Sequence, residues 1–146
     1  MAPEELRKLL PTHKSDLDRA RAIIALGYPA VEPLLPELVK WLGDRNWPVT
    51  RALLPLFISI GAPLAPHVAP ILLGNDSWWA YTTMIEVVIY SPPLAAALVP
   101  QLQELANATA ERWIEGRTPG EMDRQDVKEL IEMAQEALEL ARNHSS

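Results

Sequence analysis

The prolines of this sequence recur at fixed distances from three markers of helix ends, and this regularity constrains the fold more than any other feature. The markers are Gly27, Gly61 and Ser91, which lie 34 and then 30 residues apart (61 − 27 and 91 − 61). Each is followed by prolines at +2 and +9: Pro29 and Pro36, Pro63 and Pro70, Pro93 and Pro100. Because proline disrupts a helix interior but suits a first turn, this spacing indicates helices of regular length. Such periods are typical of two-helix repeats, so the chain is predicted to be an all-α, short α-solenoid of about three helical hairpins.

The repeat divides the chain into hairpins of a single domain that covers residues 1–146. The hairpins are expected at roughly 15–43, 46–74 and 77–107, and a C-terminal helix at roughly 119–143. That helix follows Thr118-Pro119-Gly120-Glu121, which has the spacing of a capping box. Its apolar positions share one face: Val127, Leu130, Ile131, Ala134, Leu138 and Ala141. An amphipathic helix of this kind closes the open end of a helical stack, where a polar outer surface is needed.

The polar corner between the first two hairpins contains residues expected at a helix end and at a helix start. A helix over roughly residues 31–42 is followed by Gly43, which tolerates the left-handed conformation common at helix C-termini. Asn46 is a good N-cap for the next helix. That helix is expected over residues 48–60, with Pro48 in its first turn, where a missing N–H costs nothing.

The composition excludes several classes of function. The chain has no cysteine and three scattered histidines, so disulfides and thiolate chemistry are excluded and neither a metal nor a cofactor is expected. The formal net charge of −6 repels phosphate backbones, so no nucleic acid partner is expected. The longest apolar run, residues 77–90, contains Glu86 and is shorter than the ~20 residues that span a bilayer, so no membrane partner is expected either. The acidic N-terminal residues do not resemble a signal peptide, and the expected location is the cytoplasm.

The corner also carries a pattern that resembles a known family. The pattern is Trp41-Leu42-x-Asp44-x-Asn46-Trp47-Pro48-Val49, preceded by Leu10-Pro11-x-x-Lys14-x-Asp16 and by Gly27-Tyr28. It is similar to that of an uncharacterised family of small bacterial proteins with HEAT-like helical hairpins, known as a domain of unknown function. The resemblance covers roughly residues 9–140 and implies a HEAT-like α-solenoid, but no activity. The chain departs from the pattern at Trp79, where a basic residue usually follows the tryptophan.

The candidate binding residues lie at the corner and at its counterpart one repeat later, with tryptophans 31 residues apart (78 − 47): Asp44, Asn46, Trp47, Trp41 and Trp78. In one interpretation they form a recognition site on one edge of the solenoid, an aromatic groove for a peptide or a flat ligand. In the other, Asn46 caps a helix, Asp44 orders the turn and the indoles fill corners of the structure. We expect a mixture, with Trp47 buried while Asp44 and Trp78 are partly exposed.

Arg51 and Glu86 are the charged residues of two otherwise apolar helical runs. They could pair across neighbouring repeats, or each could lie on an exposed strip of its own helix. Their separation of 35 residues (86 − 51) exceeds the 31-residue offset of the tryptophans, which favours exposure.

The sequence contains no recognisable catalytic motif, so the chain is predicted not to be an enzyme but a binding module, with another protein as its partner. A bacterial immunity or toxin-neutralising role is a specific alternative, because a small acidic protein suits a basic partner. A further alternative is a helical repeat that binds a small ligand. A HEAT-like DNA glycosylase is disfavoured by the acidic charge, since such an enzyme needs a basic face toward the DNA.

Overall fold

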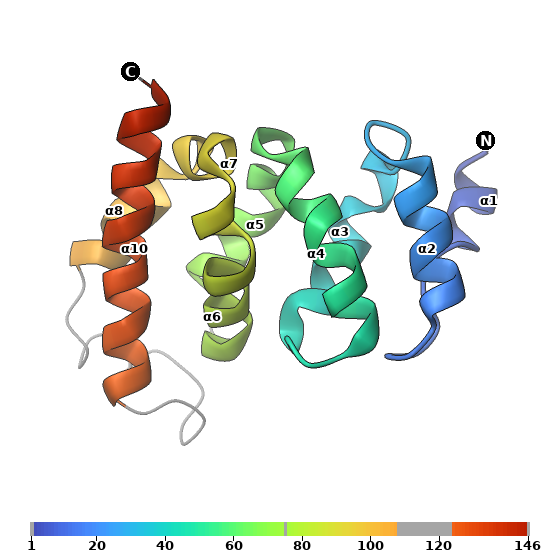
Figure 1. The fold of residues 1–146 in the computed structure, drawn as a ribbon, viewed down its shortest axis with the longest axis horizontal. Helices are drawn as coiled ribbons and strands as arrows, with labels where there is room; N and C mark the ends of the chain where they lie inside the picture. Colours follow the sequence, from blue (N-terminus) through green and yellow to red (C-terminus); the bar gives the residue numbers. More distant parts are fainter. Residues whose placement is uncertain (1, 75, 108–123, 146) are drawn as a thin grey trace.

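The computed structural model describes residues 2–74, 76–107 and 124–145. Every regular element in these ranges is a helix, so the predicted all-α fold is confirmed. The helices follow one another in chain order along the long axis, from the N-terminus to α10 at the other end (Figure 1). The elements are α1 (Pro3–Arg7), α2 (Leu17–Leu26), η1 (Glu32–Leu34), α3 (Leu35–Leu38), η2 (Val39–Gly43), α4 (Pro48–Ile60), η3 (Ala62–Leu64), α5 (Ala65–Leu72), α6 (Ser77–Glu86), η4 (Val88–Tyr90), α7 (Pro92–Ala97), α8 (Val99–Asn107) and α10 (Arg124–Ser145), where η denotes a 3-10 helix.

Two glycines end helices where the sequence predicted. α2 stops before Gly27, whose φ is 68°, and α4 stops before Gly61, whose φ is 69°. Glycine is favoured here because a Cβ atom makes positive φ unfavourable. Gly43 has no positive φ, so its predicted left-handed conformation is wrong. The 3-10 helix η2 includes Gly43, and the chain leaves it in an extended conformation at Asp44 (φ −142°, ψ 116°).

The return segment of the first hairpin, predicted as a helix over roughly residues 31–42 without a decision on whether it begins at Pro36, is divided. It consists of η1, α3 and η2, and the third hairpin likewise returns through two helices, α7 and α8. Pro36 is the second residue of α3 and Pro100 the second residue of α8. At these positions proline's missing N–H removes no intrahelical bond, so the prolines at +9 start new helices there. In the second hairpin, Pro70 lies inside α5.

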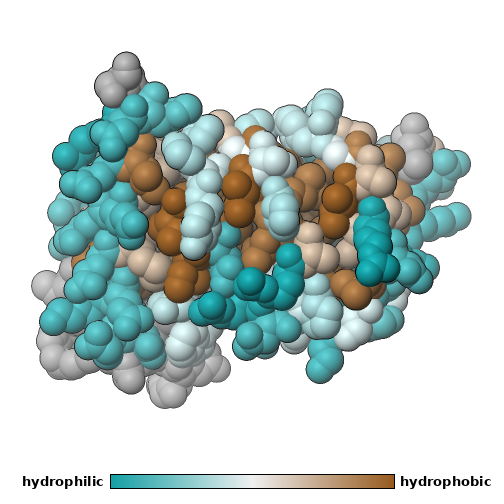
Figure 2. Space-filling view, viewed as in Figure 1, coloured by the Kyte–Doolittle hydropathy of each residue, from teal (hydrophilic) through white to brown (hydrophobic). Residues whose placement is uncertain are grey.

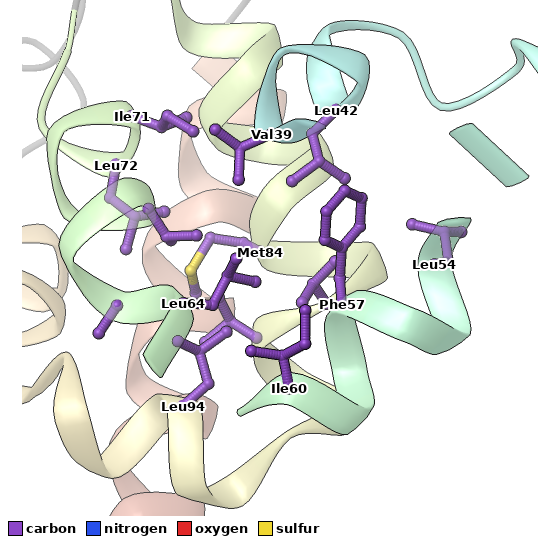
Figure 3. Packing of buried hydrophobic residues seen from close by; sticks show 14 of the residues in the cluster. Val39, Leu42, Leu54, Phe57, Ile60, Leu64, Ile71, Leu72, Met84 and Leu94 are labelled. Atoms are coloured by element: carbon purple, nitrogen blue, oxygen red, sulfur yellow. The ribbon is translucent and has the colours of Figure 1, made fainter. Parts of the chain in front are cut away.

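A single hydrophobic cluster extends through the row of helices and holds neighbouring hairpins together. Figure 3 shows its central part, where side chains from η2, α4, α5 and α6 point toward one another. The labelled residues are Val39, Leu42, Leu54, Phe57, Ile60, Leu64, Ile71, Leu72, Met84 and Leu94. Phe57 and Met84 are fully buried, and burial of a side chain of this size contributes about 1.5–3 kcal/mol. The shared core therefore sets the position of each hairpin relative to the next.

The C-terminal helix α10 packs against α7 and α8 at the end of the row away from the N-terminus (Figure 1). Val127, Leu130, Ala134 and Ala141 of its predicted apolar face are buried. The predicted amphipathic helix is therefore confirmed over its described part. The capping box predicted at residues 118–121 lies outside the described residues.

Within the described ranges, no single helix is both long and apolar enough to span a bilayer. α4 and the segment Ala62–Leu72 reach that length and composition only as a pair, which is bent by 113°. Both members contribute fully buried side chains to the core, among them Phe57 and Leu64.

Candidate functional site

The corner between η2 and α4 is closed by a hydrogen bond from the main chain to Asp44. The backbone N–H of Asn46 donates to Asp44 Oδ1 over 2.8 Å, as in an Asx turn. Asp44 is half-buried, whereas Asn46 is exposed and its side chain makes no hydrogen bond with the part of the chain that the structure describes. Trp47 occupies the N-cap position of α4, which has no side-chain cap. The prediction that Asn46 caps α4 is therefore wrong, and the prediction that Asp44 orders the turn is confirmed.

At the start of α4 one preceding main-chain carbonyl takes the place of a side-chain cap, and a second one binds a hydroxyl of the helix. Pro48, the first residue of the helix, has no N–H to satisfy. The N–H of Val49 donates to the carbonyl of Lys14 over 2.9 Å. The hydroxyl of Thr50 donates to the carbonyl of Trp41. These two bonds attach the first turn of α4 to preceding segments of the chain, and the Lys14 carbonyl accepts an N–H that a capping side chain would otherwise accept.

Trp41 and Trp47 form an aromatic pair at the corner. Their ring centroids lie 5.7 Å apart and their planes are inclined by 76°, the edge-to-face geometry that the ring quadrupoles favour. Both residues are half-buried, so Trp47 is less buried than predicted. The pair contributes packing and also leaves aromatic surface accessible beside Asp44 and Asn46.

Trp78 belongs to a different aromatic pair, within α6. Its ring lies edge-on to that of Tyr81 at 5.4 Å, and the Tyr81 hydroxyl donates to Glu129 Oε2 on α10 over 3.1 Å. Burial, and then the hydrogen bond with Glu129, raises the pKa of Tyr81, so the phenol keeps its proton. It is the next residue, Trp79, that reaches the first hairpin, because its indole N–H donates to the carbonyl of Val39 over 3.0 Å. Sequence reasoning missed this contact, because its two partners are 40 residues apart in the chain.

Glu86, the last residue of α6, is the centre of an ionic cluster. Its Oε1 lies 3.1 Å from Nη2 of Arg45 and 3.0 Å from Nη1 of Arg51. The Glu86 side chain is 11% exposed, whereas those of Arg45 and Arg51 are 45% and 54% exposed. The predicted exposure of Glu86 is therefore wrong, because hairpin packing brings the end of α6 within reach of the start of α4. The sequence did not mark Arg45 as a member of this cluster, because it stands among polar residues and not within an apolar run as Arg51 and Glu86 do.

An apolar groove of about 350 Å³ lies between the return segments of the first two hairpins. It brings together two prolines from the +9 positions, one from each repeat, beside the indole of Trp79. Its lining consists of Pro36, Val39, Pro66, His67, Pro70, Ile71, Gly74, Asp76 and Trp79. Its volume lies within the ~300–1,000 Å³ typical of small-ligand pockets. Across the described ranges, no three His, Asp or Glu side chains come together in a way that could hold a metal ion.

The fold and this corner define an all-α protein of helical hairpins with an aromatic and ionic surface between its first and second hairpins. The model of a family described as a domain of unknown function (DUF5071) matches residues 9–138, a range that includes the corner and the helices from α2 to α8. The chain belongs to this family, and the predicted membership of a family of unknown function is confirmed. A search of the curated proteins found no match.

Proposed function

We propose that this chain is a non-enzymatic binding module that recognises another protein through the corner between η2 and α4. The observation that carries the proposal is the exposed side chain of Asn46, which sits on a turn ordered by Asp44 and does not cap α4. A polar group that folding does not use, held on an ordered turn, is free to bind a partner. The half-buried Trp41 and Trp47 beside it supply the aromatic surface that is enriched in protein interfaces.

Neutralisation of a basic protein, as in an immunity role, is one specific form of this function, and the net charge of −6 supports it. The resemblance to the bacterial family leads us to propose that the hairpins are of the HEAT type and that the source is bacterial. Glycosylase activity on DNA remains disfavoured, because the same charge opposes approach to the phosphate backbone.

A second candidate function, binding of a small ligand, is favoured by the groove beside Trp79. The groove is large enough for a small organic molecule, and its wall is mainly proline and aliphatic side chains. The hydrogen bond of the Trp79 indole to Val39 fixes the ring in that wall. A flat apolar ligand would contact this ring.

Affinity capture with matched variants distinguishes the two functions. The immobilised wild-type protein, Asn46→Ala and Arg21→Gln are each exposed to a lysate of the source organism, and the retained proteins are quantified by mass spectrometry. Arg21→Gln is the control, because Arg21 is exposed on α2 and its 3.8 Å ion pair with Asp18 joins two exposed side chains. We expect a protein that the wild type and Arg21→Gln retain and that Asn46→Ala loses. Equal retention by all three would contradict the proposal, and recovery of a small molecule without a protein would favour the groove.

A further inference from the structure

The ionic cluster holds two arginines against one glutamate in a protein whose formal net charge is −6. Two guanidinium groups, of Arg45 and Arg51, face the single carboxylate of Glu86. The C-terminal end of α6, where Glu86 lies, adds about half a negative charge. The two arginines therefore carry one positive charge more than Glu86 can match, and among the described residues Asp44, which precedes Arg45, makes no ion pair with either of them. Figure 2 shows a strongly hydrophilic patch over α6 and the lower end of α4, bordered by apolar surface.

Most of the hydrogen-bonding capacity of the two arginines is unused. A guanidinium group has five N–H donors, and the ion pairs with Glu86 involve one nitrogen of Arg45 and one of Arg51. Among the described residues, neither arginine makes another ion pair or side-chain hydrogen bond. Glu86 therefore holds two half-exposed guanidinium groups close together while most of their donors remain free. Such donors bind carboxylates through short, charge-assisted hydrogen bonds.

The surface beside these arginines is aromatic and apolar. Trp47 is the N-cap residue of α4, directly before the first turn, and Pro55 follows Arg51 by four residues, about one turn along the same face of the helix. Trp47 is half-buried and Pro55 is exposed. A nucleic acid backbone would require a row of basic residues, whereas here a basic residue alternates with apolar ones. This strip fits a protein segment that offers a carboxylate next to apolar side chains.

We propose that Arg45 and Arg51, positioned by Glu86, bind a carboxylate of an acidic segment of the partner protein. This inference rests on the proposed protein-binding function and specifies its chemistry. It differs from the expectation of a basic partner, which considers only the net charge of the chain. Arg45 and Arg51 are the binding residues, and Glu86 acts through them as a positioning residue.

An NMR titration of the wild-type protein tests the proposal directly. The arginine Nε–H signals are followed at physiological ionic strength while hexaglutamate, hexalysine, inorganic phosphate or a single-stranded oligonucleotide is added. We expect hexaglutamate to move the signals of Arg45 and Arg51 and to leave that of Arg21 in place. Because the chain is acidic, long-range attraction cannot produce this result. Unmoved signals at Arg45 and Arg51, or an equal response to hexalysine, phosphate or the oligonucleotide, would overturn the proposal.

Matched variants then measure the contribution of each arginine. We expect Arg45→Gln and Arg51→Gln each to weaken hexaglutamate binding about tenfold, through loss of a charge-assisted bond, and Arg21→Gln to change it by less than about twofold. If Arg45→Gln or Arg51→Gln unfolds at the same temperature as the wild type and binds hexaglutamate equally well, the proposal is overturned. If either variant does not fold, the titration of the wild-type protein decides. If hexaglutamate does not bind but the affinity capture still recovers a protein that Asn46→Ala loses, this inference is refuted and the proposed function stands. If hexaglutamate binds but the capture recovers no protein that Asn46→Ala loses, the arginine site is supported and the proposed function is refuted.

Discussion

Replacing the two polar residues of the corner by alanine separates their roles. Asp44→Ala removes the acceptor of the 2.8 Å bond from the N–H of Asn46. Hydrogen bonds to charged groups contribute about 1.5–3 kcal/mol, but Asp44 is only half-buried, so screening by solvent reduces the expected loss to about 1 kcal/mol. Asn46→Ala removes an exposed amide that has no intramolecular bond in the described structure, so the free energy of unfolding should change by less than about 0.5 kcal/mol.

Thermal unfolding followed by far-ultraviolet circular dichroism measures this difference. In a chain of this size, about 1 kcal/mol corresponds to a change of about 3 °C in Tm. We therefore expect Asp44→Ala to lower Tm by about 3 °C and Asn46→Ala by less than about 1.5 °C. Asp44→Asn, which keeps an acceptor oxygen in place, is the matched control and should retain most of the stability. A larger loss for Asn46→Ala than for Asp44→Ala would refute this reasoning, because it would show that the asparagine caps α4.

Three further predictions concern the fold and can be measured by urea unfolding. Gly61→Ala should lower the free energy of unfolding by about 1–3 kcal/mol, because the φ of 69° at this position disfavours a side chain. Gly43→Ala is the control and should be nearly neutral, since the added Cβ would meet no atom within 4 Å. Equal losses would contradict this prediction. Thr50→Val removes a fully buried hydroxyl and its hydrogen bond to the carbonyl of the half-buried Trp41, which should cost about 1–2 kcal/mol; unchanged stability would show that the bond is dispensable. Phe57→Ala should cost about 3–5 kcal/mol by emptying the core, and a loss below about 1 kcal/mol would contradict the observed packing.

Local signals allowed the sequence to predict several helix boundaries. α4 runs from Pro48 to Ile60 as expected, because proline suits a first turn and Gly61 accepts a positive φ after the last. The same holds for the end of α2 at Gly27. The turn formed by Asp44 was also predictable, since its partner is the main chain only two residues away. Each of these features depends on residues that are close in sequence.

The missing cap of α4 shows where local reasoning ends. Asparagine before a helix is a common cap, yet the first turn of α4 is bonded to the carbonyls of Lys14 and Trp41. Lys14 lies 35 residues before Val49 (49 − 14), so its carbonyl is supplied by the packing of the first hairpin on the second. Asn46 is therefore exposed because of how the hairpins pack, in spite of the preference of asparagine for N-cap positions.

Only the tertiary structure decided which side chains of different hairpins meet. Glu86 pairs with residues 35 and 41 positions earlier (86 − 51 and 86 − 45), and the indole of Trp79 bonds to a carbonyl 40 residues away. These contacts depend on the rotation of each helix about its axis, and an error of one residue rotates a side chain by about 100°. The proline repeat specifies the order and approximate length of the helices but not this rotation. The sequence by itself therefore determined that the chain is a row of helical hairpins with polar corners, while core packing between the hairpins set the rotations that bring Arg45, Arg51 and Glu86 together.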